Sequence, residues 1–218
     1  MTVDSSKRNL NWFLRVKSLG AIFRKKYPTV VIGRENIPAG EAFAFIVGPH
    51  KSMYETIVVP AYLQEIEFHI MIKDSLFVFG LGAILRSAGA IPVNRSGKGI
   101  LAIEAAAADL ERGYSTMAYL EGTRFPEDNY LHRGKTGVVR SALMAGKKVI
   151  PVGIRGMMPS DPEVPREIHI GQPINVVDRL AEIVSASEDE LSPATSLRLL
   201  TDSIMEDVAD LADVIYEG

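Results

Sequence analysis

The stretch that decides the fold is AFAFIV at residues 42–47, which is followed at once by GPHKSMYE at residues 48–55. The first part is a short, continuous apolar run, and such a run is typical of a strand that is buried on both faces of a parallel sheet. The second part is a polar loop that leads into a predicted helix ending near Leu63. Together they predict a strand, a loop and a helix in succession.

The same alternation continues along the chain on both sides of this stretch. Further strands are predicted at 29–32, 68–73, 90–93, 116–120, 149–154 and 167–170. Helices are predicted at 76–88, 98–112 and 134–145, and two acidic helices follow after residue 178. Alternation of this kind predicts an α/β fold with a mostly parallel central sheet and helices on both faces.

Length and composition favour a single domain spanning residues 1–218, with an α/β core at 28–177. The hydrophobic content of 47% is enough for a large core, and the net charge is only -3. From 178 to 218 there are eleven acids against two arginines, so we expect an acidic helical tail. The chain has no cysteine, which excludes disulfides, thiol catalysis and zinc–thiolate sites.

The N-terminal segment 7–27 is basic and is predicted to form an amphipathic helix. It carries seven cations and no acid, and apolar residues are interleaved with the cations. Two interpretations fit this pattern: a helix that lies in a membrane interface, or a helix that docks on the domain with solvated cations. The interleaving suits a lipid surface better than nucleic acid, so no nucleic-acid partner is expected.

The expected location is the cytoplasm, with the protein peripheral on the inner face of the membrane. The N-terminus lacks the long apolar run and the small-residue cleavage site of a secretory signal. No stretch approaches the roughly 18 to 20 apolar residues of a membrane-spanning helix. The most apolar segment, 76–84, is interpreted as part of the core, with the lining of an apolar groove as the alternative.

A histidine and a carboxylate, His50 and Glu55, are separated by five positions across the predicted junction between strand and helix. At this spacing the acid can orient the imidazole, which leaves the outer ring nitrogen free to take a proton from a hydroxyl. The alternative is a histidine that only bonds locally at the start of the helix. The other histidines, His69, His132 and His169, are interpreted as structural.

A second segment, Tyr119-Leu120-Glu121-Gly122-Thr123-Arg124, follows another predicted strand. Its glycine and arginine can bind a phosphate through backbone amides and a guanidinium fork, although Arg124 in a structural ion pair is the alternative. Ligands of parallel sheets bind outside the carboxyl ends of the strands. We therefore expect His50 and Glu121 to lie at one shared site.

Four motifs, in order, resemble those of the glycerophosphate and 1-acylglycerol-3-phosphate O-acyltransferase family, part of the lysophospholipid acyltransferase superfamily. The matching stretches are PHKSMYE at 49–55, GAIPVNR at 89–95, YLEGTR at 119–124 and VIPVGI at 149–154. The first corresponds to the family's Asn-His-x-Ser-x-x-Asp, and the third to its Phe-Pro-Glu-Gly-Thr-Arg. Two short sequences that contain a lysine, at Lys73 and Lys135, also resemble the family. The resemblance extends over residues 30–173.

The resemblance implies a function in phospholipid biosynthesis. By it, His50 is the general base, Glu55 orients it, and no acyl-enzyme, metal or cofactor is required. The acyl donor is a thioester of coenzyme A or of a carrier protein, and the acceptor is a hydroxyl of a lysophospholipid such as 1-acylglycerol-3-phosphate. The resemblance also implies an acceptor or phosphate site, formed by Glu121, Gly122, Thr123, Arg124, Arg95 and Lys73.

Three residues depart from the family pattern: Glu55 replaces an aspartate, Pro49 replaces an asparagine and Asn94 replaces an acid. The extra methylene of Glu55 moves its carboxylate by about 1.5 Å, which is enough to disturb the pair unless the backbone adjusts. These changes leave two alternatives open. One is the same chemistry on a glycolipid or a specialised metabolite, and the other is a non-catalytic homologue that binds lipid or acyl thioester.

Overall fold

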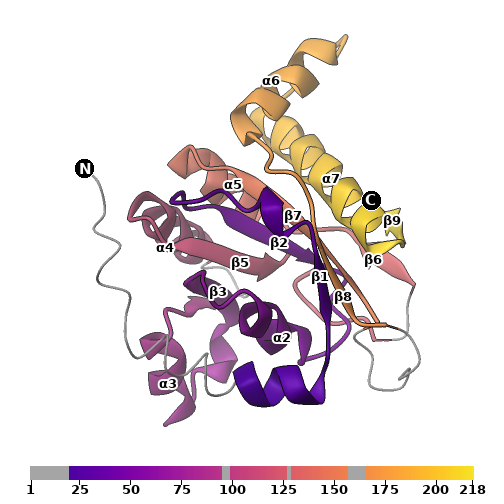
Figure 1. Cartoon of the computed structure of the whole chain (residues 1–218). Helices are drawn as coiled ribbons and strands as arrows, with labels where there is room; N and C mark the ends of the chain where they lie inside the picture. Colours follow the sequence, from indigo (N-terminus) through magenta and orange to yellow (C-terminus); the bar gives the residue numbers. More distant parts are fainter. Residues whose placement is uncertain (1–19, 95–98, 127–128, 157–164) are drawn as a thin grey trace.

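The computed structural model describes residues 20–94, 99–126, 129–156 and 165–218. Its centre is a seven-stranded sheet with the order β1-β8-β7-β2-β5-β3-β4 (Figure 1). The strands are β1 Val30–Ile32, β2 Ala44–Gly48, β3 Phe68–Lys73, β4 Ile91–Val93, β5 Ser115–Tyr119, β7 Val149–Arg155 and β8 Glu167–Ile170. Every neighbouring pair is parallel except β7 and β8, which are antiparallel. The predicted α/β fold with a mostly parallel sheet is confirmed.

Helices cover both faces of this sheet, as expected (Figure 1). They are α2 Glu55–Tyr62, α3 Leu81–Ser87, α4 Gly99–Glu111, α5 Gly137–Ala145, α6 Val176–Ala186 and α7 Pro193–Ala212. Because side chains alternate along a strand, Phe45 and Val47 of β2 pack with α2, whereas Ala44 and Ile46 pack with α5 and α7. All five residues of β2 are buried, which agrees with its continuous apolar sequence.

The acidic C-terminal segment forms part of the core through α7. The hydroxyl of Ser192 accepts a hydrogen bond from the amide of Thr195, and Pro193 follows at the first turn, so the helix starts with a regular cap. Its inner face buries the apolar residues Leu200, Ile204, Met205 and Val208. After α7, β9 (Ile215–Glu217) pairs with β6 (Tyr130–His132) in a small second sheet that the sequence patterns did not predict.

The predicted helix 76–88 is wrong in its first half. A 3-10 turn, η3 (Asp74–Leu76), comes first, and α3 begins only after Gly80, whose φ of 80° breaks the helix. Gly82 is the one residue of α3 that is buried. The interpretation of segment 76–84 as core is therefore also wrong.

The described end of the predicted N-terminal helix, residues 20–26, is helical and lies against α2. The Arg24 guanidinium donates to the carbonyl of Ala61 at 2.8 Å. The amide of Thr29 donates to the Tyr62 hydroxyl at 2.8 Å. Residues 7–19 of the predicted helix lie outside the described residues. Among the helices that the structure describes, none combines the length and the apolar character that crossing a bilayer requires.

Candidate active site

Two neighbouring parallel strands bring the predicted site residues together. β2 pairs with β5 in the register Val47 to Tyr119, so the two strands end side by side at one edge of the sheet. His50 lies two residues beyond β2, and Glu121 lies two residues beyond β5. β3 is the next strand after β5 and ends at Lys73. The expectation that His50 and Glu121 lie at one site is therefore met.

His50 and Glu55 form a hydrogen-bonded pair in which Glu55 is buried and His50 is partly exposed. The Nδ1 atom of His50 lies 3.0 Å from Oε2 of Glu55, and the exposed fractions of the two side chains are 16% and 1%. A carboxylate at Nδ1 keeps the proton on that nitrogen. Nε2 of His50 is then the ring nitrogen with a free lone pair, so the pair has the arrangement of a general base with its orienting acid.

The extra methylene of Glu55 does not break this pair, because Glu55 is the first residue of α2 and its side chain folds back over the preceding loop. Its carboxylate accepts hydrogen bonds from the amide of Ser52 at 2.8 Å and from the amide of Lys51 at 3.1 Å. The hydroxyl of Ser52 donates to it as well, at 3.2 Å. The bond from the Ser52 amide to the Glu55 carboxylate is one half of a capping box, in which a glutamate accepts from an amide three residues before it. The His50 loop and the start of α2 are thus held by one carboxylate.

Tyr119, the last residue of β5, supports the imidazole from one side. Its ring stacks on that of His50, with centroids 4.2 Å apart and an angle of 25° between the planes. The Tyr119 hydroxyl is buried and has no hydrogen-bond partner among the described residues. Burial raises its pKa well above the usual value, and the nearby Glu55 charge raises it further. The ring therefore remains neutral and limits the rotation of His50. Sequence reasoning gave Tyr119 no role.

Glu121 holds the loop that carries His50. Its carboxylate accepts from the amide of His50 at 2.5 Å and from the amide of His132, on β6, at 3.1 Å. The amide of Phe125 in turn donates to the carbonyl of His50 at 2.9 Å. Glu121 is only 5% exposed, so its charge serves backbone amides inside the protein. Its predicted contact with an acceptor stays a prediction.

We expect the stability contributed by Glu121 to decrease as the pH rises. Burial raises the pKa of Glu121 above its usual 4.5, against the smaller lowering effect of the amides of His50 and His132. An acid whose pKa is raised in the folded state stabilises the protein fully at pH values below its pKa in the unfolded state. That stabilisation is lost as the pH rises through its pKa in the folded state. The free energy of unfolding of wild type minus that of Glu121→Gln should therefore fall from pH 4.5 upward. Urea titrations of both proteins test this, and a difference that stayed constant with pH would contradict it.

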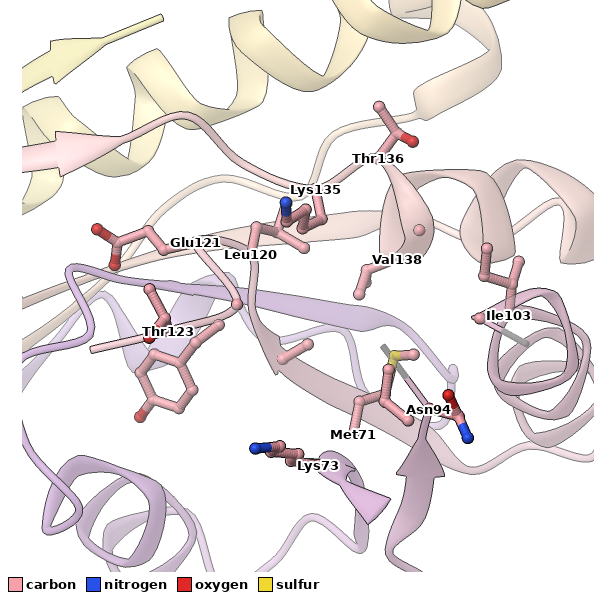
Figure 2. Close-up of a pocket in the computed structure, with 16 residues that line it drawn as sticks. Met71, Lys73, Asn94, Ile103, Leu120, Glu121, Thr123, Lys135, Thr136 and Val138 are labelled. Atoms are coloured by element: carbon pink, nitrogen blue, oxygen red, sulfur yellow. The ribbon is translucent and has the colours of Figure 1, made fainter. Parts of the chain in front are cut away.

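A cavity of about 660 Å³ opens beside these residues, at the carboxyl ends of β3 and β5 (Figure 2). Figure 2 shows the ammonium groups of Lys73 and Lys135 on opposite sides of the cavity. Tyr119 and Glu121 also line it, so the cavity adjoins His50 through the tyrosine ring. The other lining residues are Met71, Val93, Asn94, Gly99, Ile103, Ala118, Leu120, Gly122, Thr123, Thr136, Gly137 and Val138. Two cations in a largely apolar cavity suit a ligand that has an anionic group and an apolar part.

Gly122 shapes the turn at the edge of this cavity. Its φ is 72°, a backbone conformation that costs other residues about 1–2 kcal/mol. A Cβ atom added there would lie 3.5 Å from Cγ of Lys135, which is ordinary contact. The turn therefore requires glycine for its conformation and not for space. The amide of Lys135 donates to the carbonyl of Leu120 at 2.7 Å, which holds the two cavity-lining loops together.

The structure places some of the predicted site residues at the cavity and others away from it. Lys73, Glu121, Gly122 and Thr123 line the cavity, while His50 and Glu55 lie beside it. Arg124 is exposed and does not line the cavity. Arg95 lies outside the described residues. Lys135 and Asn94 line the cavity although neither was assigned to the site from the sequence. The described histidines, aspartates and glutamates contain no group of three or more that could hold a metal.

Comparison with known proteins gives three similarities. A family model described as Acyltransferase matches residues 29–155. A protein from Bacillus subtilis (strain 168), named 1-acyl-sn-glycerol-3-phosphate acyltransferase, is 29% identical over 127 residues, which are 58% of this chain and 62% of that protein. The chain thus matches less than two thirds of the length of that relative.

The third similarity is to a crystal structure, that of the 1-acyl-sn-glycerophosphate (LPA) acyltransferase PlsC from Thermotoga maritima. The TM-score is 0.66 and the identity is 19%, and the similarity covers 91% of this chain and 79% of that one. At this level of identity the likeness shows a shared fold. It extends beyond the family-model match on both sides and includes most of the C-terminal region.

Proposed function

Because the chain belongs to the acyltransferase family, whose model matches residues 29–155, we propose that it transfers a fatty acyl group from a thioester to a hydroxyl of a lysophospholipid. The observation that carries this proposal is the partly buried His50–Glu55 pair, 3.0 Å between Nδ1 and Oε2, beside a cavity with two lysines. The pair supplies a base for a hydroxyl, and the cavity supplies a place for an acceptor with an anionic group and an apolar chain.

In the proposed reaction, Nε2 of His50 removes the proton from the acceptor hydroxyl as its oxygen attacks the thioester carbonyl carbon. A new C–O bond forms and the C–S bond breaks. The departing thiolate takes the proton back from the imidazolium, so the products are an ester and a free thiol. Glu55 stabilises the imidazolium while it exists, and a positioned base of this kind accelerates such a reaction about 10²–10⁴-fold.

We propose 1-acylglycerol-3-phosphate as the acceptor, with its phosphate near Lys73 or Lys135. Both lysines line the cavity. Among the described residues, Glu121 is the one acid that lines it with them, and its carboxylate binds two backbone amides. The name of the Bacillus subtilis relative points to the same acceptor. The donor is proposed to be a thioester of coenzyme A or of an acyl carrier protein, and exposed Arg124 is available to its phosphates.

The proposal is tested by incubating the purified protein with 1-acylglycerol-3-phosphate and either palmitoyl-coenzyme A or palmitoyl acyl carrier protein. Formation of the diacyl product is measured by mass spectrometry, since release of free thiol alone would also report simple hydrolysis. Product with either donor supports the transferase and identifies the donor. Absence of product with both donors, over a panel that includes glycolipid acceptors, would reject the proposal and favour a non-catalytic binding protein.

Replacement of Lys73 by methionine is expected to raise the KM for 1-acylglycerol-3-phosphate about tenfold, with kcat changed much less. A charge-assisted hydrogen bond to phosphate contributes about 1.5–3 kcal/mol, and that contribution is lost. Lys135→Met, on the other side of the cavity, is the second variant. Lys148→Met is the matched control, because Lys148 is paired with Glu41 at 3.2 Å and precedes β7 at the opposite edge of the sheet.

Steady-state kinetics with the phosphate-bearing acceptor and with monoacylglycerol, which lacks the phosphate, check this prediction. The KM for monoacylglycerol should not change in either variant. An equal rise in KM for both acceptors would show that the lysines support the cavity without binding the phosphate.

A further inference from the structure

The segment around η3 and α3 exposes large apolar side chains that no part of the described structure covers. Phe79 is fully exposed, and the exposed fractions of its neighbours in this segment lie between 44% and 58%. These neighbours are Leu76, Val78, Leu81 and Ile84. Since α3 buries only Gly82, its own packing does not explain why the sequence is apolar here.

A second group of exposed apolar side chains lies at the start of α2, directly after His50. Met53 is 63% exposed, and Tyr54 and Ile57 are also exposed. The ring of Tyr54 contacts that of Tyr27 at a centroid distance of 5.1 Å. This contact places the helix at 20–26, with its exposed Ile22, next to the same surface.

Both groups belong to the edge of the sheet where the active site lies. The first follows the carboxyl end of β3, three residues after the cavity-lining Lys73, and the second follows the carboxyl end of β2. β2 and β3 are parallel to β5, which lies between them, so their ends are about 10 Å apart. We call the eight residues the apolar rim: Met53, Tyr54, Ile57, Leu76, Val78, Phe79, Leu81 and Ile84.

Cations lie beside both groups of the apolar rim, while η3 itself begins with the acid Asp74. The sequence has no acid between Asp74 and Glu104, and Arg86 of α3 extends over the ring of Phe77, 5.4 Å from its centroid. Lys25 and Lys26 are exposed at the end of the helix 20–26, directly before Tyr27, whose ring contacts that of Tyr54. Eleven of the 27 acids of the chain lie from residue 178 onward, in the segment that packs on the opposite face of the sheet from α2.

We propose that the apolar rim inserts into the surface of a phospholipid bilayer that contains anionic lipids. Large exposed apolar patches mark interaction sites. Exposed apolar side chains with cations beside them suit the boundary between the lipid headgroups and the acyl chains of a bilayer. Docked in this way, the mouth of the cavity faces the layer in which a lysophospholipid resides. The inference rests on the proposed function only for that last step, since membrane binding itself requires no turnover.

The absence of cysteine allows a direct test with the full chain. An environment-sensitive fluorophore is attached to Phe79→Cys, and as the control to Val184→Cys, which is 45% exposed on α6. Vesicles of phosphatidylcholine and phosphatidylglycerol are then added. We expect a blue shift and a several-fold increase in emission at position 79, and no change at position 184.

A second experiment measures co-sedimentation of the unlabelled protein with the same vesicles. The triple variant Phe79→Ser, Leu81→Ser, Ile84→Ser should partition at least about tenfold less, because the apolar area available for burial is reduced. The double variant Val177→Ser, Val184→Ser on α6 should partition like wild type. All five side chains are exposed, so the variants should retain the fold, which circular dichroism verifies.

The other outcomes distinguish a failure of this inference from a failure of the proposed function. Vesicle binding without a change at position 79 would assign the membrane contact to another part of the chain, such as residues 7–19. A blue shift at position 79 before vesicles are added would show that another segment or a second copy covers the rim. Vesicle binding through the rim by a protein that gives no diacyl product would reject the proposed function and leave this inference intact.

Discussion

Replacement of His50 by alanine is expected to lower kcat for acyl transfer about 1,000-fold, within the range that a positioned general base supplies. Nε2 of His50 is the ring nitrogen available to a hydroxyl, because Nδ1 is bound to Glu55 at 3.0 Å. Without the imidazole, water must take the proton. Binding of the acceptor should change little, since Lys73 and Lys135, the proposed anchors of its phosphate, remain. The measurement is diacyl product formed per unit time at saturating substrates, by mass spectrometry.

The chain contains a matched control for this variant. Nδ1 of His69 lies 2.7 Å from Asp109 and the ring stacks on Tyr114, so the surroundings of His69 resemble those of His50. His69 belongs to the amino end of β3, at the opposite edge of the sheet from Lys73. His69→Ala should reduce the thermal stability but leave kcat within a few-fold of wild type. Similar losses of kcat in both variants would indicate that His50→Ala acts through the fold and not through lost base catalysis.

Replacement of Glu55 by glutamine is expected to lower kcat about 100-fold and to destabilise the protein by about 2 kcal/mol. The carboxylate accepts from His50, from the amides of Lys51 and Ser52, and from the Ser52 hydroxyl. A glutamine has one acceptor oxygen for these donors, and its amide group must face one of them. If that amide donates to Nδ1 of His50, the ring proton moves to Nε2, where the base is needed.

Two further variants separate charge from geometry at this position. Glu55→Asp keeps the charge, so its kcat should remain well above that of Glu55→Gln. The double variant His50→Ala, Glu55→Gln should be no slower than His50→Ala alone, because Glu55 acts on the reaction through the imidazole. Multiplicative losses in the double variant would give Glu55 a role independent of His50.

Periodicity and short-range spacing were sufficient for most of the fold. The strand at 42–47 could be predicted from its continuous apolar sequence, because every one of these residues is buried. Its position before a polar loop identified the edge of the sheet where His50 lies. Local signals did not predict the pairing of β6 with β9, since those strands have three residues each and lie more than 80 residues apart in the sequence. The helix α7 directly precedes β9 and contacts both strands, so its packing on the sheet places β9 beside β6.

The segment 76–84 shows where apolar composition misleads. Composition alone does not distinguish a core helix from an apolar surface, because both are rich in leucine, isoleucine and phenylalanine. Gly80, with its positive φ, ends the preceding turn, and α3 then stands at the edge of the sheet with its side chains exposed. The sequence predicted the apolar character, and the packing decided that it faces outward.

The sequence by itself determined the α/β class, the edge of the sheet where the site lies and the spacing that allows His50 to pair with Glu55, because these follow from local periodicity and from the direction of parallel strands. Only the tertiary structure decided which groups surround that pair. Three features show this: the stacking of Tyr119 on His50, the two amide contacts of Glu121 and the positions of Lys73 and Lys135 on opposite sides of the cavity. They bring together segments that are up to 71 residues apart in the sequence. Such contacts depend on how strands are ordered and how loops cross the sheet edge, and no local pattern in the sequence encodes them.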